Sequence, residues 1–137
     1  MRPGFELIHE ISLQSDPSIL VDVENLVNKI CEKLNIPEDT YGNILIAVSE
    51  ATTNAIQHGN ENNKDLDIAI RVYDNKNSFY FNITDKGKGF NFNDLPDPTS
   101  PENILKENGR GIFLMKNLSD DVVFNGSGNS VDIYFNK

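Results

Sequence analysis

Apolar and polar side chains alternate in three segments of the chain, a spacing typical of β-strands with one buried face. These segments are Phe5–Leu13, Leu66–Tyr73 and Phe79–Ile83. A polar turn separates the last two, which predicts an antiparallel hairpin. A second hairpin is expected near the C-terminus, where Asp121–Asn125 and Val131–Phe135 flank a glycine-rich turn.

Two longer segments carry apolar residues three or four positions apart, the spacing of an amphipathic helix. The first is Pro17–Leu34, and the second begins at Pro37 and ends at Gly59. A short third helix is expected over Gly109–Asn117. Between about residues 91 and 108, prolines and Asn/Asp residues interrupt every pattern. A stretch of this length without a pattern predicts a functional loop or lid.

The predicted order of elements is β-α-α-β-β-lid-α-β-β. Because the strands alternate on one face only, the sheet should be mixed or mainly antiparallel and covered by helices on one side. We therefore expect an α+β two-layer sandwich. A length of 137 residues suits a single domain spanning residues 1–137.

The composition narrows the possible functions. The 21 acidic and 12 basic side chains argue against a nucleic-acid partner, which is held mainly by Lys and Arg, but not against a small nucleotide. No segment has the roughly 18–20 apolar residues of a membrane span, and the first residues lack a secretory pattern, so a cytoplasmic location is expected. Cys31 is the only cysteine, which excludes a disulfide framework; we expect it in the core.

Three polar residues lie four positions apart on the second predicted helix: Glu50, Asn54 and His58. This spacing places them along one side of the helix, away from its apolar stripe. A solvated helix face has the same pattern. Alternatively, the Glu can accept a proton and the Asn oxygen can ligate Mg²⁺.

A glycine-rich turn, Asp85–Phe90, follows the strand Phe79–Ile83 directly. Gly87 and Gly89 allow the backbone to bend sharply and to approach a flat ligand. The Asp85 carboxylate can accept a hydrogen bond from an exocyclic amine such as that of adenine. An ordinary Asp/Gly turn has the same composition, so the pattern alone leaves both interpretations open.

Two further glycines, Gly109 and Gly111, open the third predicted helix. Free N–H groups at a helix start bind phosphate, assisted by the helix dipole and here by Arg110. No strand leads directly into this segment, and the third glycine of a Rossmann fingerprint would fall at Leu114; the chain also lacks a P-loop sequence. A plain glycine-led helix remains the alternative.

The order and spacing of these three segments resemble the Bergerat-type ATPase fold shared by gyrase, heat-shock protein 90, histidine kinases and mismatch-repair ATPases. Within that fold, the chain is similar to the small anti-sigma-factor serine/threonine kinases of bacteria from about Asp16 to Phe135. Glu50–Gly59 looks like the N box of that family. Asp85–Phe90 looks like its first glycine box, and Gly109–Met115 like its second.

The resemblance implies ATP and Mg²⁺ as cofactors. By that resemblance, Asn54 would hold Mg²⁺ between the phosphates, and Asp85 would read the adenine amine. Gly87 and Gly89 would let the backbone pass the base. Ser130 stands where relatives often place a threonine near adenine.

The resemblance also assigns the phosphate end of the nucleotide. Gly109, Arg110 and Gly111 would cradle the β- and γ-phosphates, and Arg110 would also stabilise the transferring group. Glu50 would be the general base on the acceptor hydroxyl. Two further candidates for nucleotide contacts lie close in sequence to these residues, namely His58 and Lys88.

The function implied by the resemblance is an ATP-dependent serine/threonine protein kinase that binds a sigma factor, regulates transcription and phosphorylates a small antagonist protein. A homodimer is implied as well. The alternative is a non-catalytic ATP- or ADP-binding switch module that binds a regulatory partner. His9-Glu10 matches the pair phosphorylated in histidine kinases, but it falls on an alternating strand, so His9 is expected to be an ordinary strand residue.

Overall fold

The computed structural model describes residues 2–87, 107–125 and 129–137 of the chain. These residues form five strands and three main helices, with a short 3₁₀ turn, Pro17–Ile19, and a π turn, Ala55–Gly59. The main elements in chain order are β1 (Glu6–Gln14), α1 (Leu20–Lys33), α2 (Glu38–Asn54), β2 (Asp67–Asp74), β3 (Ser78–Thr84), α4 (Glu107–Leu118), β4 (Asp121–Asn125) and β5 (Ser130–Asn136).

The five strands form one antiparallel sheet in the order β1-β2-β3-β5-β4. Strand register brings apolar residues of neighbouring strands opposite one another. Ile70 of β2 lies opposite Ile83 of β3, which in turn lies opposite Val131 of β5. Because side chains alternate along each strand, such rows give the sheet one continuous apolar face.

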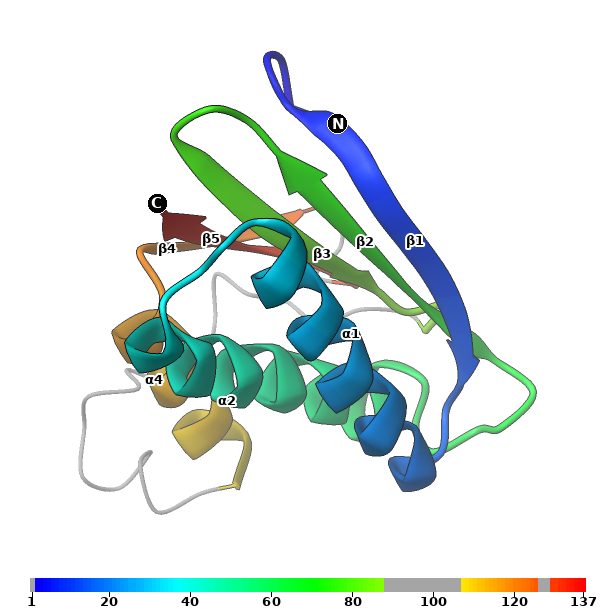
Figure 1. Ribbon diagram of the computed structural model, residues 1–137. Coiled ribbons are helices and arrows are strands. Elements are labelled where there is room, and N and C mark those ends of the chain that lie inside the picture. The colour runs from blue at the N-terminus through cyan, green and yellow to red at the C-terminus, as the bar shows by residue number, and fades with distance from the viewer. Residues whose placement is uncertain (1, 88–106, 126–128) are drawn as a thin grey trace.

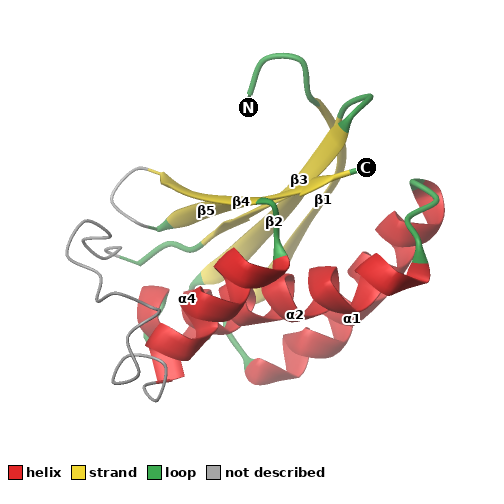
Figure 2. Cartoon of the chain, turned by 90° about the vertical axis from the view of Figure 1, so that its left-hand side faces the viewer, coloured by secondary structure: helices red, strands yellow, loops and turns green. Residues whose placement is uncertain are grey.

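The helices α1, α2 and α4 all cover this apolar face, as Figures 1 and 2 show. Val27 of α1 and Ile44 of α2 are fully buried, as are Phe81 and Ile133 on the inner face of the sheet. The core therefore lies between one layer of helices and one sheet. The predicted α+β two-layer sandwich is confirmed, and the sheet is antiparallel in all its described strands.

The helix ends differ from the predicted ones in two places. The second helix ends at Gly59 as predicted, but its last five residues form the π turn, in which the Asn60 N–H donates to Ala55 O at 2.8 Å. Helix α4 begins at Glu107, so Gly109 lies within its first turn instead of opening it. Apart from the first two residues of α4, the predicted lid at 91–108 lies outside the described residues.

Residues interpreted as structural lie where the sequence predicted. Cys31 is buried on α1, and burial raises the pKa of its thiol. His9 lies in β1, where burial and the nearby Lys29 and Lys33 lower the pKa of its imidazole. Among the described helices, none combines the length and the apolar character needed to cross a bilayer.

The opposite face of the sheet is covered by aromatic side chains rather than by described helices. Tyr73, Tyr80 and Tyr134 stack across β2, β3 and β5, with ring centroids 4.8 Å and 4.6 Å apart. Phe5 packs edge-on against Tyr80 at 4.9 Å, and the Arg2 guanidinium lies 5.1 Å from the Tyr134 ring centroid. The N-terminal residues therefore lie across this face.

The burial pattern of α2 predicts how substitutions along it affect stability. Ile44→Ala is expected to lower the free energy of unfolding by about 2–5 kcal/mol, because it leaves a cavity beneath the helix. Ile46→Ala, on the same helix but with 44% of its side chain exposed, should cost less than about 1 kcal/mol. Urea unfolding of both variants measures the difference, and equal losses would contradict the described orientation of α2.

Candidate functional site

Glu50 and Asn54 lie one turn apart on the side of α2 that faces α4. Gly111 of α4 is buried against them: a methyl group at its position would lie 2.9 Å from Glu50 Oε2 and 3.6 Å from both amide atoms of Asn54. Both polar side chains are half-buried, so this side of α2 is not a solvated face. The absence of a side chain at Gly111 lets α4 approach the carboxylate and the amide closely.

The turn after β3 packs against the π turn that ends α2. A methyl group on Gly87 would lie 1.7 Å from the Gly59 carbonyl oxygen, and one on Gly59 would lie 2.1 Å from Asp85 Oδ2. Both distances are far shorter than van der Waals contact: a side chain at Gly87 would meet backbone atoms, and one at Gly59 would meet the Asp85 carboxyl group. The sequence pattern predicts a close approach of the Gly87 backbone to a ligand; the close approach in the structure is to the π turn.

Asp85 is held in this turn by its neighbours. Its N–H donates to Asn129 O at 2.9 Å, and its Oδ1 accepts a hydrogen bond from the Gly87 N–H at 2.9 Å. Only 6% of the residue is exposed. Burial raises the pKa of the carboxyl group, and the Gly87 hydrogen bond opposes that rise. A buried carboxylate with a raised pKa is more common at functional sites than elsewhere.

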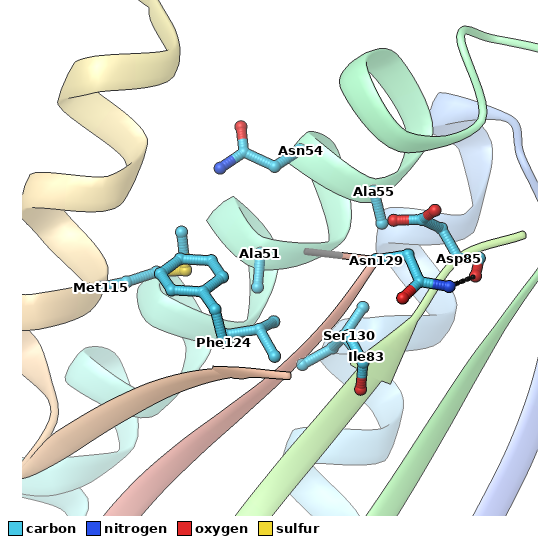
Figure 3. A pocket seen from close by; sticks show the side chains of 10 residues that line it. Ala51, Asn54, Ala55, Ile83, Asp85, Met115, Phe124, Asn129 and Ser130 are labelled. Carbon is cyan, nitrogen blue, oxygen red and sulfur yellow. Dashed lines mark hydrogen bonds between the residues drawn. The ribbon is translucent and has the colours of Figure 1, made fainter. Parts of the chain in front are cut away.

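A cavity joins Asp85 to the polar side of α2. Figure 3 shows Asn54 above this cavity, with Asp85 and Asn129 at one end and Met115 and Phe124 at the other. The cavity is lined by Ala51, Asn54, Ala55, Ile83, Asp85, Met115, Phe124, Asn129, Ser130 and Val131. Apolar walls with a few polar groups at the ends are typical of a site for a flat heterocycle.

The cavity measures about 20 Å³, which is room for about one water molecule. A purine ring therefore requires neighbouring side chains to move. Met115 is unbranched and can adopt several rotamers, and it forms part of the wall opposite Asp85. The small side chains of Ala51 and Ala55 leave the helix side of the cavity open to a ring.

The structure brings some of the predicted site residues together and not others. Asn54, Asp85 and Ser130 line one cavity, and Gly111 lies against Glu50 and Asn54. His58 is exposed on the π turn and does not line the cavity, because the buried residues of that turn are Ala55, Ile56 and Gly59. Arg110 is exposed in the first turn of α4, next to Gly109. Lys88 and Gly89 lie outside the described residues.

The Ser130 hydroxyl is hydrogen-bonded within the sheet. The Oγ atom accepts a hydrogen bond from Asn82 Nδ2 at 2.9 Å and lies 3.0 Å from Thr84 Oγ1. Asn82 and Thr84 alternate with the core residues of β3, so they belong to the helix-free face of the sheet. The hydroxyl is therefore engaged on that face, although the residue lines the cavity.

Sequence reasoning missed several residues of the cavity. Ala51 and Ala55 are small residues four positions apart on the sheet side of α2, a spacing that signals close packing but not a ligand. Asn129 contributes its backbone oxygen to Asp85, which no side-chain pattern reveals. Phe124 lies in a short strand whose pairing had to be known before its direction could be assigned.

Comparison with known proteins identifies similar chains. The family model described as a histidine kinase-like ATPase domain matches residues 13–135. The serine-protein kinase RsbW of Bacillus subtilis (strain 168) is 30% identical over 129 residues, which cover 89% of this chain and 81% of that protein. The serine-protein kinase RsbW of Bacillus licheniformis is 29% identical over 119 residues, which cover 82% of this chain and 74% of that protein.

The contact between Gly59 and Gly87 predicts a large cost for a side chain at Gly87. Gly87→Ala is expected to lower the free energy of unfolding by at least about 2 kcal/mol, because the new methyl group meets backbone atoms that cannot move aside. Gly42→Ala is the matched control: a methyl group on this α2 residue meets nothing within 4 Å. It should raise stability by about 0.5–1 kcal/mol through helix propensity. Urea unfolding tests both signs.

The burial of Asp85 predicts a pH-dependent gain from Asp85→Asn in the nucleotide-free protein. The pKa of Asp85 is higher in the folded state than in the unfolded chain, so the charged carboxylate destabilises the fold once the pH exceeds the folded pKa. Asparagine is uncharged and keeps an acceptor for the Gly87 N–H. At neutral pH the variant should unfold at a higher urea concentration than the wild type. The difference between the two unfolding midpoints should become smaller as the pH falls toward 3.8, the ordinary pKa of an aspartate. A gap that does not change with pH contradicts this assignment.

Proposed function

The chain belongs to the family of histidine kinase-like ATPase domains, and on this basis we propose that it is a cytoplasmic, ATP-dependent serine/threonine protein kinase of the anti-sigma-factor type. One observation carries the proposal. Asn54 and Asp85, far apart in sequence, line one cavity, and Gly111 of α4 packs against both Asn54 and Glu50. A nucleotide bound there would have its base near Asp85 and its phosphates near α4.

Asp85 is proposed to accept a hydrogen bond from the exocyclic amine of adenine. Its carboxylate is buried at the end of a largely apolar cavity, where a hydrogen bond to a charged group contributes more than it does in water. The apolar side chains of Ile83 and Met115 would contact the ring. In this proposal Gly87 acts indirectly, by letting the Asp85 turn pack against the π turn.

Asn54 is proposed to ligate Mg²⁺ through its amide oxygen. Mg²⁺ prefers oxygen ligands and usually binds through one or two protein groups together with substrate phosphates and water. Asn54 lines the cavity, and Gly111 of α4 lies against its amide group. When bound, Mg²⁺ would neutralise charge on the phosphates.

The first turns of α4 are proposed to receive the β- and γ-phosphates. Backbone N–H groups of the first turn of a helix have no intrahelical partners, and Gly109 lies in the first turn of α4. The exposed Arg110 side chain would contact the γ-phosphate and stabilise the transferring group. Because Gly111 has no side chain, α4 lies close to Glu50. Phosphates bound at the start of α4 would therefore lie near the proposed general base.

Glu50 is proposed to act as the general base. It would accept the proton of a serine or threonine hydroxyl as that oxygen bonds to the γ-phosphorus. The bond between the γ-phosphorus and the β–γ bridging oxygen breaks in the same step, and ADP leaves. The work of the remaining residues is positioning and charge stabilisation.

The proposed partners are a sigma factor, which the chain would bind and hold inactive, and a small antagonist protein, which it would phosphorylate. Serine kinase activity is the activity named for the RsbW proteins of Bacillus subtilis and Bacillus licheniformis. Unphosphorylated antagonist would compete with the sigma factor and release it. A homodimer is part of this proposal.

Transfer of labelled phosphate tests the kinase proposal. With Mg·ATP and a candidate antagonist, the wild type should label the antagonist, and Glu50→Gln should reduce the rate at least about 100-fold, because the general base is lost. Glu50→Gln should still bind nucleotide, with a stabilisation on the order of 2–4 kcal/mol at saturating Mg·ATP. Glu24→Gln, on the exposed side of α1, is the matched control and should transfer at the wild-type rate.

The remaining outcomes separate the alternatives. Stabilisation by Mg·ATP without transfer to any antagonist-type protein would favour a non-catalytic nucleotide switch. Absence of a thermal shift with ATP or ADP would contradict nucleotide binding itself. Equal transfer rates for Glu50→Gln and the wild type would remove Glu50 from the mechanism.

A further inference from the structure

We propose that Asn60 is a positioning residue that fixes the direction of the Asp85 carboxylate and thereby gives the cavity its preference for adenine over guanine. This inference rests on the proposed function, in which Asp85 accepts a hydrogen bond from the adenine amine. It extends that function to a residue outside the cavity lining. Asn60 lies directly after the π turn, and only 2% of it is exposed.

The side chain of Asn60 joins three segments that are far apart in sequence. Its Nδ2 donates to Ser15 Oγ at 2.6 Å, and to the backbone oxygens of Leu66 and Asp67 at 3.2 Å each. Its Oδ1 accepts a hydrogen bond from the Lys86 N–H at 2.8 Å. One buried amide therefore ties the end of β1 and the start of β2 to the turn after β3.

The bond to Lys86 acts directly on the Asp85 backbone. The Lys86 N–H belongs to the peptide group that follows Asp85, and the N–H of Asp85 itself is bonded to Asn129 O. The peptide groups on both sides of Asp85 are therefore held, one by Asn60 and one by Asn129. With its backbone fixed and its Oδ1 bonded to the Gly87 N–H, the carboxylate has a defined direction.

The π turn places Asn60 where it can make these bonds. A π turn adds one residue to a helical turn, and each residue of a regular helix adds about 100° of rotation. If α2 continued as a regular helix, the Asn60 side chain would point in another direction and would miss the Lys86 N–H.

The direction of Asp85 matters because adenine and guanine differ at the atom it would contact. Adenine presents an amine, a hydrogen-bond donor, where guanine presents a carbonyl oxygen, which a carboxylate repels. Hydrogen bonds weaken steeply when their angle departs from linearity. A site discriminates strongly by a hydrogen bond only while its buried polar group is held in place. Loosening Asp85 would therefore weaken ATP binding and relax the rejection of GTP.

Dissociation constants for Mg·ATP and Mg·GTP test the proposal. They are measured by titration calorimetry on the wild type, Asn60→Ala and Ser15→Ala, together with the melting temperature of each nucleotide-free protein. The wild type should prefer ATP, and Asn60→Ala should reduce that preference at least about tenfold. Ser15→Ala is the matched control: it removes a buried partner of Asn60 but leaves the bond to Lys86. It should lower the melting temperature and keep the ATP/GTP ratio within about twofold.

Two further variants keep the test decisive. Asn60→Asp retains an acceptor for the Lys86 N–H but turns its second oxygen toward the Leu66 and Asp67 carbonyl oxygens, so it should melt earlier than the wild type and still prefer ATP. If Asn60→Ala does not fold, Asn60→Ser takes its place, because its side chain ends one bond short of the Oδ1 position and cannot keep the 2.8 Å bond to the Lys86 N–H. An Asn60 variant that melts earlier but keeps the wild-type ATP/GTP ratio overturns the positioning role. If the wild type binds ATP and GTP equally well, this inference is overturned but the proposed function is not. If the wild type binds neither nucleotide, both the inference and the proposed function are overturned.

Discussion

The backbone contact between Gly59 and Gly87 is the constraint on which the candidate site depends. Elsewhere in the fold, apolar side chains fill the space between the helices and the sheet. At this point the backbone of the π turn after α2 contacts the backbone of the turn after β3 directly. The contact brings Asp85, at the end of a central strand, within reach of a cavity that also includes Asn54. A side chain at Gly87 would push the two layers apart there, and one at Gly59 would displace the Asp85 carboxyl group at the acidic end of the cavity.

Sequence patterns were sufficient to predict the elements and the two-layer arrangement. Alternation in β2 and β3, and a stripe of apolar residues in α1 and α2, follow from burying one face of each element, so burial leaves a direct record in the sequence. The π turn cannot be read from the spacing of apolar residues, because the residue that follows it, Asn60, is held by hydrogen bonds to segments far away in the sequence. Helix α4 begins two residues before Gly109, because the glycines that the pattern predicts as its start lie inside its first turn and a half.

Spacing along the sequence predicted which residues belong to the candidate site, but not the contacts that depend on the three-dimensional arrangement of the strands. Short motifs single out Asn54 and Asp85 as candidate site residues. The structure shows that the two residues line the same cavity. Sequence could not show that the Ser130 hydroxyl bonds to the opposite face of the sheet, because that depends on strand register. It also could not show that Asn60 is buried, because a polar residue after a helix is ordinarily solvated.

The stacked tyrosines on the helix-free face have a consequence for optical spectroscopy. The chain contains no tryptophan and four tyrosines, and three of those, Tyr73, Tyr80 and Tyr134, belong to the stack. Ultraviolet emission and near-ultraviolet dichroism of the protein therefore originate mainly from the side of the sheet that faces away from the cavity. Such signals monitor contacts made on that side, and filling of the cavity is better followed with a fluorescent ligand.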